Sequence, residues 1–310
     1  MNKTIALLFS LFAFLSYAEK PEYFFFSPEM IRSHIENYTE EEKEAILKDL
    51  EVVKNVCTPI QEKTSHQKPI YLATAGAPGA RKTTILERFM NHYVLSSYMT
   101  YLDPDQRALK FMPHTYYSKS LSALSIAKQK NYIQHVQRAY EKWRGASNFI
   151  TFTLLEEAFA SGQNIAHGTT STGAHIPAFL SKVKQSGYEI ILLLCSAQDD
   201  LRREAIEYRN TEQKFYQSTP EDAVSKGKTF PMRMHAYFTY GDSLYLFWSD
   251  ALFEQEHLAA TLSNGELKIH NLESLNKFIC QFERDREILL QEGQKIPTWN
   301  ELLDMYRSRF

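Results

Sequence analysis

The chain has 310 residues, enough for one sizeable α/β core with an attached helical segment. Hydrophobic residues make up 44% and charged residues 23%, which is ordinary for a globular protein, and the net charge of -2 shows none of the basic excess that favours nucleic acid. Cys57, Cys195 and Cys280 are far apart and odd in number, so they predict neither a disulfide framework nor a zinc site.

The N-terminus has the pattern of a secretory signal. Lys3 precedes an apolar run from Ile5 to Leu15, and small residues follow up to Ala18. The run is shorter than the roughly 20 residues that cross a bilayer. We therefore predict a signal peptide at residues 1–18 and no membrane association after processing. An apolar N-terminal segment packed on the domain is the alternative.

Residues 19–68 are predicted to form a helical extension, with a capping box of Thr39 and Glu42 before a helix over residues 40–56. Strands and helices alternate in the next segment, residues 69–250, which predicts a parallel sheet with right-handed crossovers. The expected strands are 70–75, 100–102, 164–167, 188–195 and 243–248, and the expected helices start at 82 and cover 118–144, 149–160, 176–184 and 200–209.

Polar residues dominate 210–232, which indicates a mobile connection or lid. In the C-terminal segment, residues 251–310, Asn264-Gly265 predicts a hairpin turn, and helices are expected over 272–291 and 298–308. The predicted fold class is therefore α/β: a parallel sheet flanked by helices, with N- and C-terminal helical additions.

A glycine-rich stretch, Gly76-Ala77-Pro78-Gly79-Ala80-Arg81-Lys82-Thr83, stands between the first strand and the following helix. Backbone amides and a helix N-terminus at such a junction converge on phosphate oxygens, as in P-loop NTPases. Lys82 would reach the β- and γ-phosphates, and the Thr83 hydroxyl would hold Mg²⁺. The predicted nucleotide-binding residues are Gly76, Gly79, Ala80, Arg81, Lys82, Thr83 and Thr84.

The motif departs from the strict pattern at Arg81, which replaces the usual second glycine. An arginine at positive φ costs roughly 1 kcal/mol or more. Its guanidinium would either contact phosphate or plug the site. A coincidental Gly/Pro turn before a helix is the alternative interpretation of the whole motif.

Two carboxylates, Asp103 and Asp105, follow the second strand. The carboxyl ends of parallel strands line the ligand crevice, so both are expected beside the phosphates. One can organise Mg²⁺, and the other can accept a proton from a hydroxyl that attacks the γ-phosphate. Alternatively, Asp-Pro-Asp simply ends a strand and caps the next turn.

With these motifs in place, residues 69–250 resemble the zeta toxin family of small-molecule kinases. The resembling segments are the glycine-rich stretch, Asp103-Pro104-Asp105, Pro113-His114, residues 164–172, Ser186-Gly187-Tyr188-Glu189-Ile190 and Ile206-Glu207-Tyr208-Arg209. The resemblance implies ATP and Mg²⁺ as cofactors and a sugar hydroxyl of UDP-N-acetylglucosamine as the acceptor.

Carried over residue by residue, the resemblance makes Asp105 the catalytic base, with Lys82 and Arg209 as further catalytic residues. Arg203 is a rival to Arg209. Acceptor contacts are expected from Asp103, His167, Thr169 and Thr170, and metal contacts from Thr83 and Asp103. Arg202 and Arg203 otherwise read as a solvated surface.

Two positions depart from the family pattern. His167 stands where the family often has glutamate, and a strand-end histidine is more often a hydrogen-bonded structural residue. Gln217 stands before Ser218-Thr219-Pro220, where a phosphate-contacting arginine is expected, and Lys214 is the nearest cation. Losing a cation there weakens stabilisation of the transferring phosphoryl group.

The sequence therefore predicts an ATP-dependent kinase acting on a hydroxyl of a small acceptor, with an antitoxin protein as a partner. The alternatives are a nucleotide-binding module with degenerate chemistry and a polynucleotide 5′-hydroxyl kinase, which the near-neutral charge disfavours. A used signal peptide predicts a secreted or periplasmic protein, and a host cell would then supply ATP. An unused one predicts a cytoplasmic protein.

Overall fold

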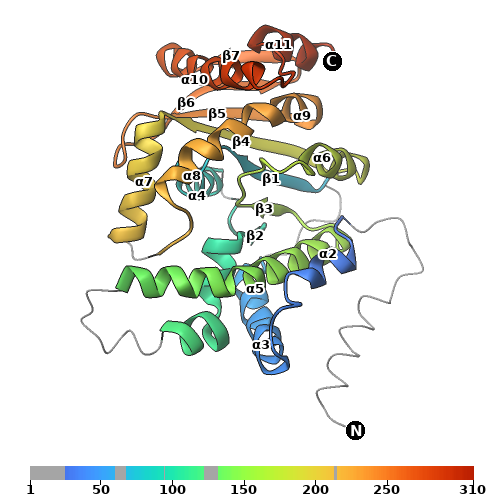
Figure 1. Ribbon diagram of the computed structural model, residues 1–310. Helices are drawn as coiled ribbons and strands as arrows, with labels where there is room; N and C mark the ends of the chain where they lie inside the picture. The colour runs from blue at the N-terminus through green and yellow to red at the C-terminus, as the bar shows by residue number, and fades with distance from the viewer. Residues whose placement is uncertain (1–24, 60–67, 94, 122–131, 213–214) are drawn as a thin grey trace.

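The computed structural model describes residues 25–59, 68–93, 95–121, 132–212 and 215–310, so the predicted signal peptide and Lys214 lie outside the described residues. Its centre is a sheet in which the described strands follow the order β2-β3-β1-β4-β5-β6-β7 (Figure 1). The first five run parallel: β1 Ile70–Ala75, β2 Thr100–Leu102, β3 Ile165–His167, β4 Glu189–Ala197 and β5 Ser243–Ser249. The hairpin strands β6 His257–Ser263 and β7 Glu266–Ile269 extend the sheet antiparallel. The predicted α/β class is confirmed.

Helices surround this sheet. In chain order they are α2 Pro28–Ser33, α3 Glu40–Cys57, α4 Lys82–His92, α5 Tyr132–Ala160, α6 Ile176–Gln185, α7 Asp199–Thr211, α8 Pro220–Ser225, α9 Met234–Tyr240, α10 Leu272–Gln291 and α11 Trp299–Arg307. Short 3-10 or π turns occupy Pro104–Ala108, Leu109–Phe111, Pro113–Leu121, Gly227–Thr229 and Pro231–Arg233. Figure 1 places α3 and α5 beside β2, and α10 and α11 at the opposite end of the sheet. Among the described residues, no helix is both long and apolar enough to cross a membrane.

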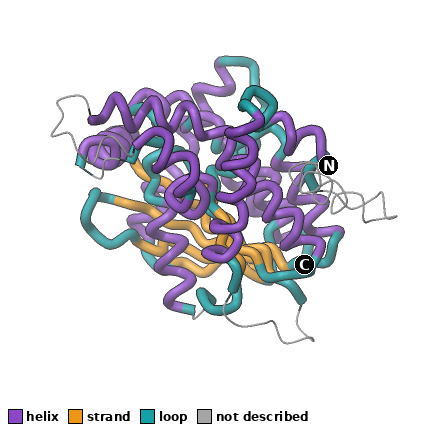
Figure 2. Tube along the Cα trace, turned by 90° about the horizontal axis from the view of Figure 1, so that it is seen from below, coloured by secondary structure: helices purple, strands orange, loops and turns teal. Residues whose placement is uncertain are grey.

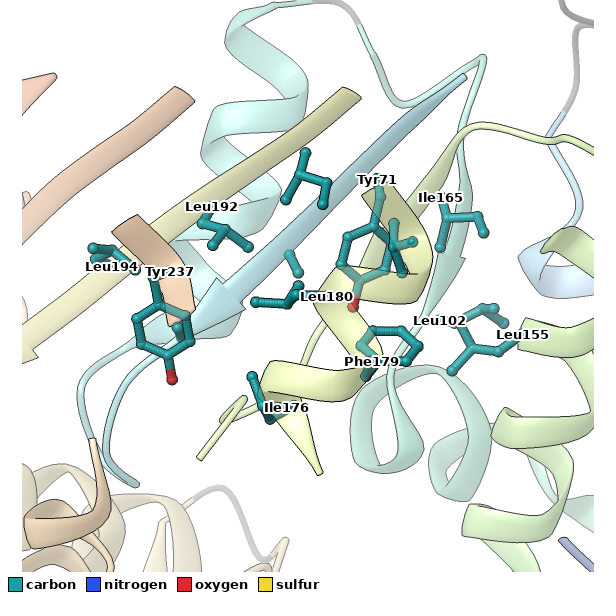
Figure 3. Close-up of a cluster of buried hydrophobic side chains, with 14 of the residues drawn as sticks. Tyr71, Leu102, Leu155, Ile165, Ile176, Phe179, Leu180, Leu192, Leu194 and Tyr237 are labelled. Atoms are coloured by element: carbon teal, nitrogen blue, oxygen red, sulfur yellow. The ribbon is translucent and has the colours of Figure 1, made fainter. Parts of the chain in front are cut away.

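The two faces of the sheet bury different helices because successive side chains of a strand point to opposite faces. Leu72 of β1 faces α4 and contacts a cluster that includes Ile85 and Leu86. Tyr71 points the other way, and its ring lies 5.6 Å from that of Phe179 on α6. Figure 2 shows helices on both sides of the strands, and Figure 3 shows the second cluster, where Tyr71 and Leu192 lie near Leu180.

The segment expected as two helices, 118–144 and 149–160, is different in the structure. Residues 132–160 form one continuous helix, α5, and Pro113–Leu121 forms π-type turns. Gly145 lies between the two predicted helices, and packing requires a glycine at this position. A Cβ at this position would lie 2.5 Å from the His34 carbonyl oxygen. Tertiary contact, not a turn, explains the glycine.

Within the polar segment predicted as a connection or lid, the described residues 215–232 contain short helical elements. Thr219 caps α8 in a reciprocal capping box with Asp222, and two short 3-10 turns follow. Helix α9 comes next and was not predicted, because its seven residues are too few to show a clear period.

Trp143 is expected to be a main stabilising residue of α5. It is fully buried, and its indole N–H donates to Ser120 Oγ at 2.7 Å. Trp143→Ala should lower the free energy of unfolding by about 3–5 kcal/mol, and Trp143→Phe by less. Urea denaturation measures both. Phe310→Ala is the control, because that ring is 63% exposed. If the two Trp143 variants had the same denaturation midpoint as the control, the assigned core position of Trp143 would be contradicted.

Candidate functional site: a phosphate loop with buried cations

The loop after β1 lies in close contact with β4 and α7. A Cβ on Gly76 would come within 2.2 Å of the Cys195 carbonyl oxygen, and one on Gly79 within 2.3 Å of the Arg202 carbonyl oxygen. The Gly76 amide donates to the Thr170 carbonyl at 3.0 Å, which ties the loop to the residues after β3. Both positions therefore have room only for glycine, and the neighbouring segments fix the conformation of the loop.

Arg81 adopts the left-handed conformation that the usual glycine would supply, with φ of 56°. This costs an L-residue about 1–2 kcal/mol. Its guanidinium turns away from the loop: Nη1 donates to the carbonyls of Ala251 at 3.1 Å and Glu254 at 2.5 Å, and Nη2 lies 3.8 Å from the Glu256 carboxylate. The side chain therefore does not plug the phosphate site.

Lys82 is the first residue of α4, and its ammonium folds over the loop. Nζ donates to the Ala77 carbonyl at 2.6 Å. Burial lowers its pKa to about 8, and the guanidinium groups of Arg209 and Arg202 act in the same direction. Thr83 and Thr84 complete the first turn of α4 and are half-buried. A polyanion at this helix N-terminus would meet backbone amides and the Lys82 ammonium together.

Asp103 is buried at the end of β2. Its Oδ1 accepts the amides of Asp105 and Gln106, each at 2.8 Å, so this carboxylate caps the turn as the alternative interpretation had it. Burial raises its pKa to about 6, while the nearby Arg144, Lys82 and Lys110 act against that rise. The capping oxygen is thus occupied, and Oδ2 lies against Gly168, where a Cβ would approach it to 2.2 Å.

Asp105 is partly exposed on the turn after β2. Its Oδ1 pairs with the guanidinium of Arg144 from α5. Burial lowers the pKa of Arg144, and its guanidinium carbon lies 5.6 Å from the centre of the Tyr140 ring. Sequence reasoning missed Arg144, since it sits in no motif. The one indication in the sequence is that Arg144 directly precedes the small residues Gly145 and Ala146, which allow α5 to pack closely against its neighbours.

Arg209 lies near the end of α7, and its Nη2 donates to Ser218 Oγ at 2.9 Å. Burial lowers its pKa to about 10, and its Nε is buried without a hydrogen-bond partner. Arg202, seven residues earlier, is also buried and pairs with Asp199, so it is not the solvated residue we expected. Arg203 points outward and pairs with exposed Asp200 at 3.3 Å, which removes it as a rival to Arg209.

His167 lies at the end of β3 with its ring in the core. Its Nδ1 is 2.8 Å from the Tyr71 hydroxyl oxygen, and burial lowers its pKa to about 3. The side chain is therefore neutral and structural in this arrangement, the alternative already raised for a strand-end histidine.

Thr169 and Thr170 brace the phosphate loop through their backbone. The Thr74 hydroxyl donates to the Thr169 carbonyl at 2.6 Å and accepts the Thr169 amide at 3.0 Å. The Thr170 carbonyl receives the Gly76 amide.

Cations from several elements gather around the loop: Lys82, Lys110, Arg144, Arg202 and Arg209, with Asp103 near them. Arg144 pairs with Asp105 and Arg202 with Asp199, whereas Lys82 and Arg209 form no salt bridge within the described residues. Positive charge without a carboxylate partner favours a polyanionic ligand. Within the described part of the chain, no cluster of three or more His, Cys, Asp or Glu residues can hold a metal. Mg²⁺ would therefore depend on Thr83, Asp103 and the phosphates themselves, which is how the ion is usually bound in such sites.

A separate cleft of about 600 Å³ lies between α7 and α10, lined by residues such as Gln198, Trp248 and Cys280. Of the residues considered for the site, only Arg203, the excluded rival to Arg209, lines it. The loop and its cations, which carry the chemistry, remain the candidate site.

A family model described as zeta toxin matches residues 54–228, more than half of the chain. The chain belongs to the zeta toxin family. The match includes the phosphate loop, both aspartates and Arg209, so this zeta toxin chain has the P-loop kinase-like core of the family.

Three solved structures are similar to this zeta toxin, and the two with TM-scores above 0.5 support its fold. A chain of the AvrRxo1-ORF1:AvrRxo1-ORF2 complex is 14% identical, with a TM-score of 0.53, and the alignment covers 91% of this chain and 94% of that chain. The same complex with ATP gives 14% identity and a TM-score of 0.55, covering 92% and 95%. A structure from the PezAT toxin–antitoxin system of Streptococcus pneumoniae is 18% identical, with a TM-score of 0.49, covering 69% and 80%. No curated protein matches the sequence.

The buried His167 predicts a pH dependence of stability in this zeta toxin. Its pKa falls from an ordinary 6.5 to about 3 on folding, so the unfolded chain binds the extra proton between these values. Stability is therefore complete above pH 6.5 and is lost as the pH falls. From pH 8 to pH 5 the wild type should lose about 2 kcal/mol more than His167→Asn, measured by urea denaturation.

Tyr71→Phe is the control for this experiment. It removes the hydroxyl beside Nδ1 and leaves the histidine buried, so the difference between pH 8 and pH 5 should persist. A wild type that tracks His167→Asn at both pH values would contradict a buried neutral ring.

Proposed function

We propose that the chain is an ATP-dependent kinase that transfers the γ-phosphate to a hydroxyl of a small acceptor, with a UDP-N-acetyl sugar as the candidate. One observation carries this proposal: the Asp105 carboxylate and the Lys82 ammonium belong to one charged cluster around Asp103, at the carboxyl ends of β1 and β2. The ATP in one neighbouring complex and the family match support it.

Bound ATP would supply the phosphoryl group, and Mg²⁺ would neutralise part of its charge. The Gly76 amide is bonded to the Thr170 carbonyl and the Ala80 amide to the Ala77 carbonyl, so these residues shape the loop, and Gly79 offers its backbone amide to the phosphates. Lys82 exchanges its bond to the Ala77 carbonyl for a phosphate oxygen. Arg209 adds a second positive charge, held in place by Ser218.

Asp105 is the proposed base. Arg144 binds its Oδ1 and fixes the carboxylate, which leaves Oδ2 to accept the proton of the acceptor hydroxyl. The freed oxygen bonds to the γ-phosphorus as the bond from that phosphorus to the β–γ bridging oxygen breaks, and ADP leaves. Asp103, Thr169 and Thr170 would border the acceptor. Lys110, near Asp103, suits an acceptor that itself carries phosphate, as a nucleotide sugar does.

A binding module without chemistry is the second candidate. Gln217 favours it, because it occupies the place of an expected arginine. Arg144 and Lys110 argue against a binding module, since they place two further cations near Asp103 that were not among the predicted site residues.

A protein partner is part of the proposal. A similar chain was solved in the complex of AvrRxo1-ORF1 with AvrRxo1-ORF2, and we infer that this chain likewise binds a protein partner. Membership of a toxin family makes an antitoxin the proposed partner. The secreted or host-directed destination suggested by residues 1–18 remains a prediction.

Lys82→Ala and Asp105→Ala separate a kinase from a binding module. Both should lower phosphotransfer at least about 100-fold, because each removes a charge or base used in the transition state. Asp105→Ala should keep its affinity for ATP, whereas Lys82→Ala should lose it. Phosphorylated UDP-N-acetylglucosamine is measured by mass spectrometry and ATP binding by calorimetry. Equal rates in all three proteins would reject the assigned site.

Arg209 has a matched control on the same helix. Arg209→Ala should lower kcat on the order of 100-fold, since a partly buried cation beside the phosphates is lost. Arg203→Ala should leave kcat within about twofold, because that side chain is exposed. Equal kcat losses in the two variants would contradict the role of Arg209.

A further inference from the structure

The most unusual feature of the phosphate loop is what Arg81 does with its side chain. The residue carries the strain of a left-handed backbone, and its guanidinium binds two backbone carbonyls of the connection between β5 and β6. We define residues 250–256 as the β5–β6 connection. Glycine at position 81 would relieve the strain and would make none of these bonds.

The bonds are well supported. The Arg81 side chain is only 10% exposed, and the Glu256 carboxylate beside it is 4% exposed. Glu256 also pairs with Arg88 at 2.7 Å. Desolvation lowers the pKa of Arg81, while Glu256 acts to raise it, so the guanidinium keeps its charge in a protected place. The phosphate loop and the β5–β6 connection are thereby fastened together.

The two sides of the phosphate loop differ in chemistry. On the side of β2 and β3 lie Asp103, Asp105 and Arg144, the groups assigned to the acceptor hydroxyl. On the side of β5 lies the β5–β6 connection, which presents Phe253. That ring is 74% exposed and meets Tyr208 of α7 edge-on, with centroids 5.0 Å apart. The nucleoside and the γ-phosphate are at opposite ends of the triphosphate chain, so a γ-phosphate that faces the acceptor would direct the nucleoside end toward the β5 side.

We propose that Arg81 is a positioning residue that fixes the β5–β6 connection at the mouth of the phosphate loop, so that this connection forms the wall for the nucleoside end of the bound nucleotide. The exposed face of Phe253 offers a stacking surface for the base. The inference rests on the proposed binding of a nucleoside triphosphate at this loop. It assigns a role to the one residue at which the loop departs from the usual motif.

The test compares ATP with inorganic triphosphate, which has the phosphates and lacks the nucleoside. Calorimetry with Mg²⁺ is applied to the full chain and its variants. Arg81→Ala should weaken ATP binding about tenfold and change triphosphate binding by less than twofold. Phe253→Ala should show the same selective loss without touching the phosphate loop.

Two controls match these variants. Arg88→Ala removes a cation from Glu256 and leaves the carbonyl bonds of Arg81 in place, so both ligands should bind as in the wild type. Phe310→Ala removes another exposed phenylalanine, at the C-terminus, and should also have no effect.

The failures are distinguishable. If the wild type binds neither ATP nor triphosphate, both the proposed function and the inference that rests on it are rejected. If the wild type binds both, and Arg81→Ala weakens both equally or neither, only the positioning role is overturned. If Arg81→Ala does not fold, Phe253→Ala provides the test. An unchanged ATP affinity in Phe253→Ala would reject the role of the β5–β6 connection as the wall of the nucleoside site.

Discussion

The site depends on how closely the loop after β1 packs against its neighbours. Gly76 and Gly79 touch carbonyl oxygens of β4 and α7 at distances that leave no room for a side chain. This contact sets the direction of the loop amides, and the amides set where a phosphate can lie. The first turn of α4 then follows with Lys82 already above the loop. The position of the phosphate site thus depends first on the backbone geometry of the loop and only then on its charged side chains.

A second feature of the site is the set of guanidinium groups around this loop. Arg202 is buried, whereas Arg144 and Arg209 are partly buried. Removing guanidinium groups from water is unfavourable unless each has partners. Asp105, Asp199 and Ser218 supply some of these partners, while Nε of Arg202 and of Arg209 has none within the described residues. A bound polyanion would add partners, so folding and ligand binding would depend on the same charges.

The parallel core could be predicted from the sequence because the patterns that indicate its strands and its loop involve residues close together in the chain. Strand β4 is a continuous apolar run, and the glycine-rich loop has a fixed spacing, so both could be predicted from neighbouring residues alone. The single helix α5 could not, since Gly145 is explained by the distant His34. The same holds for the site. Lys82 lies in a motif, whereas Arg144 reaches Asp105 from 39 residues further along the chain. The burial of Arg202 likewise depends on the packing of α7 over the loop.

The contact between Arg81 and the β5–β6 connection also bears on where this protein can be cut. The family model ends at residue 228, before β5 begins. Yet the carbonyls that hold Arg81 belong to residues 251 and 254, and its carboxylate partner is Glu256. A fragment trimmed to the matched region would retain every recognisable motif while leaving its phosphate loop without this anchor. For this chain, a fragment that keeps the anchor of its phosphate loop therefore extends through the β5–β6 connection to Glu256, beyond the boundary that the motifs alone suggest.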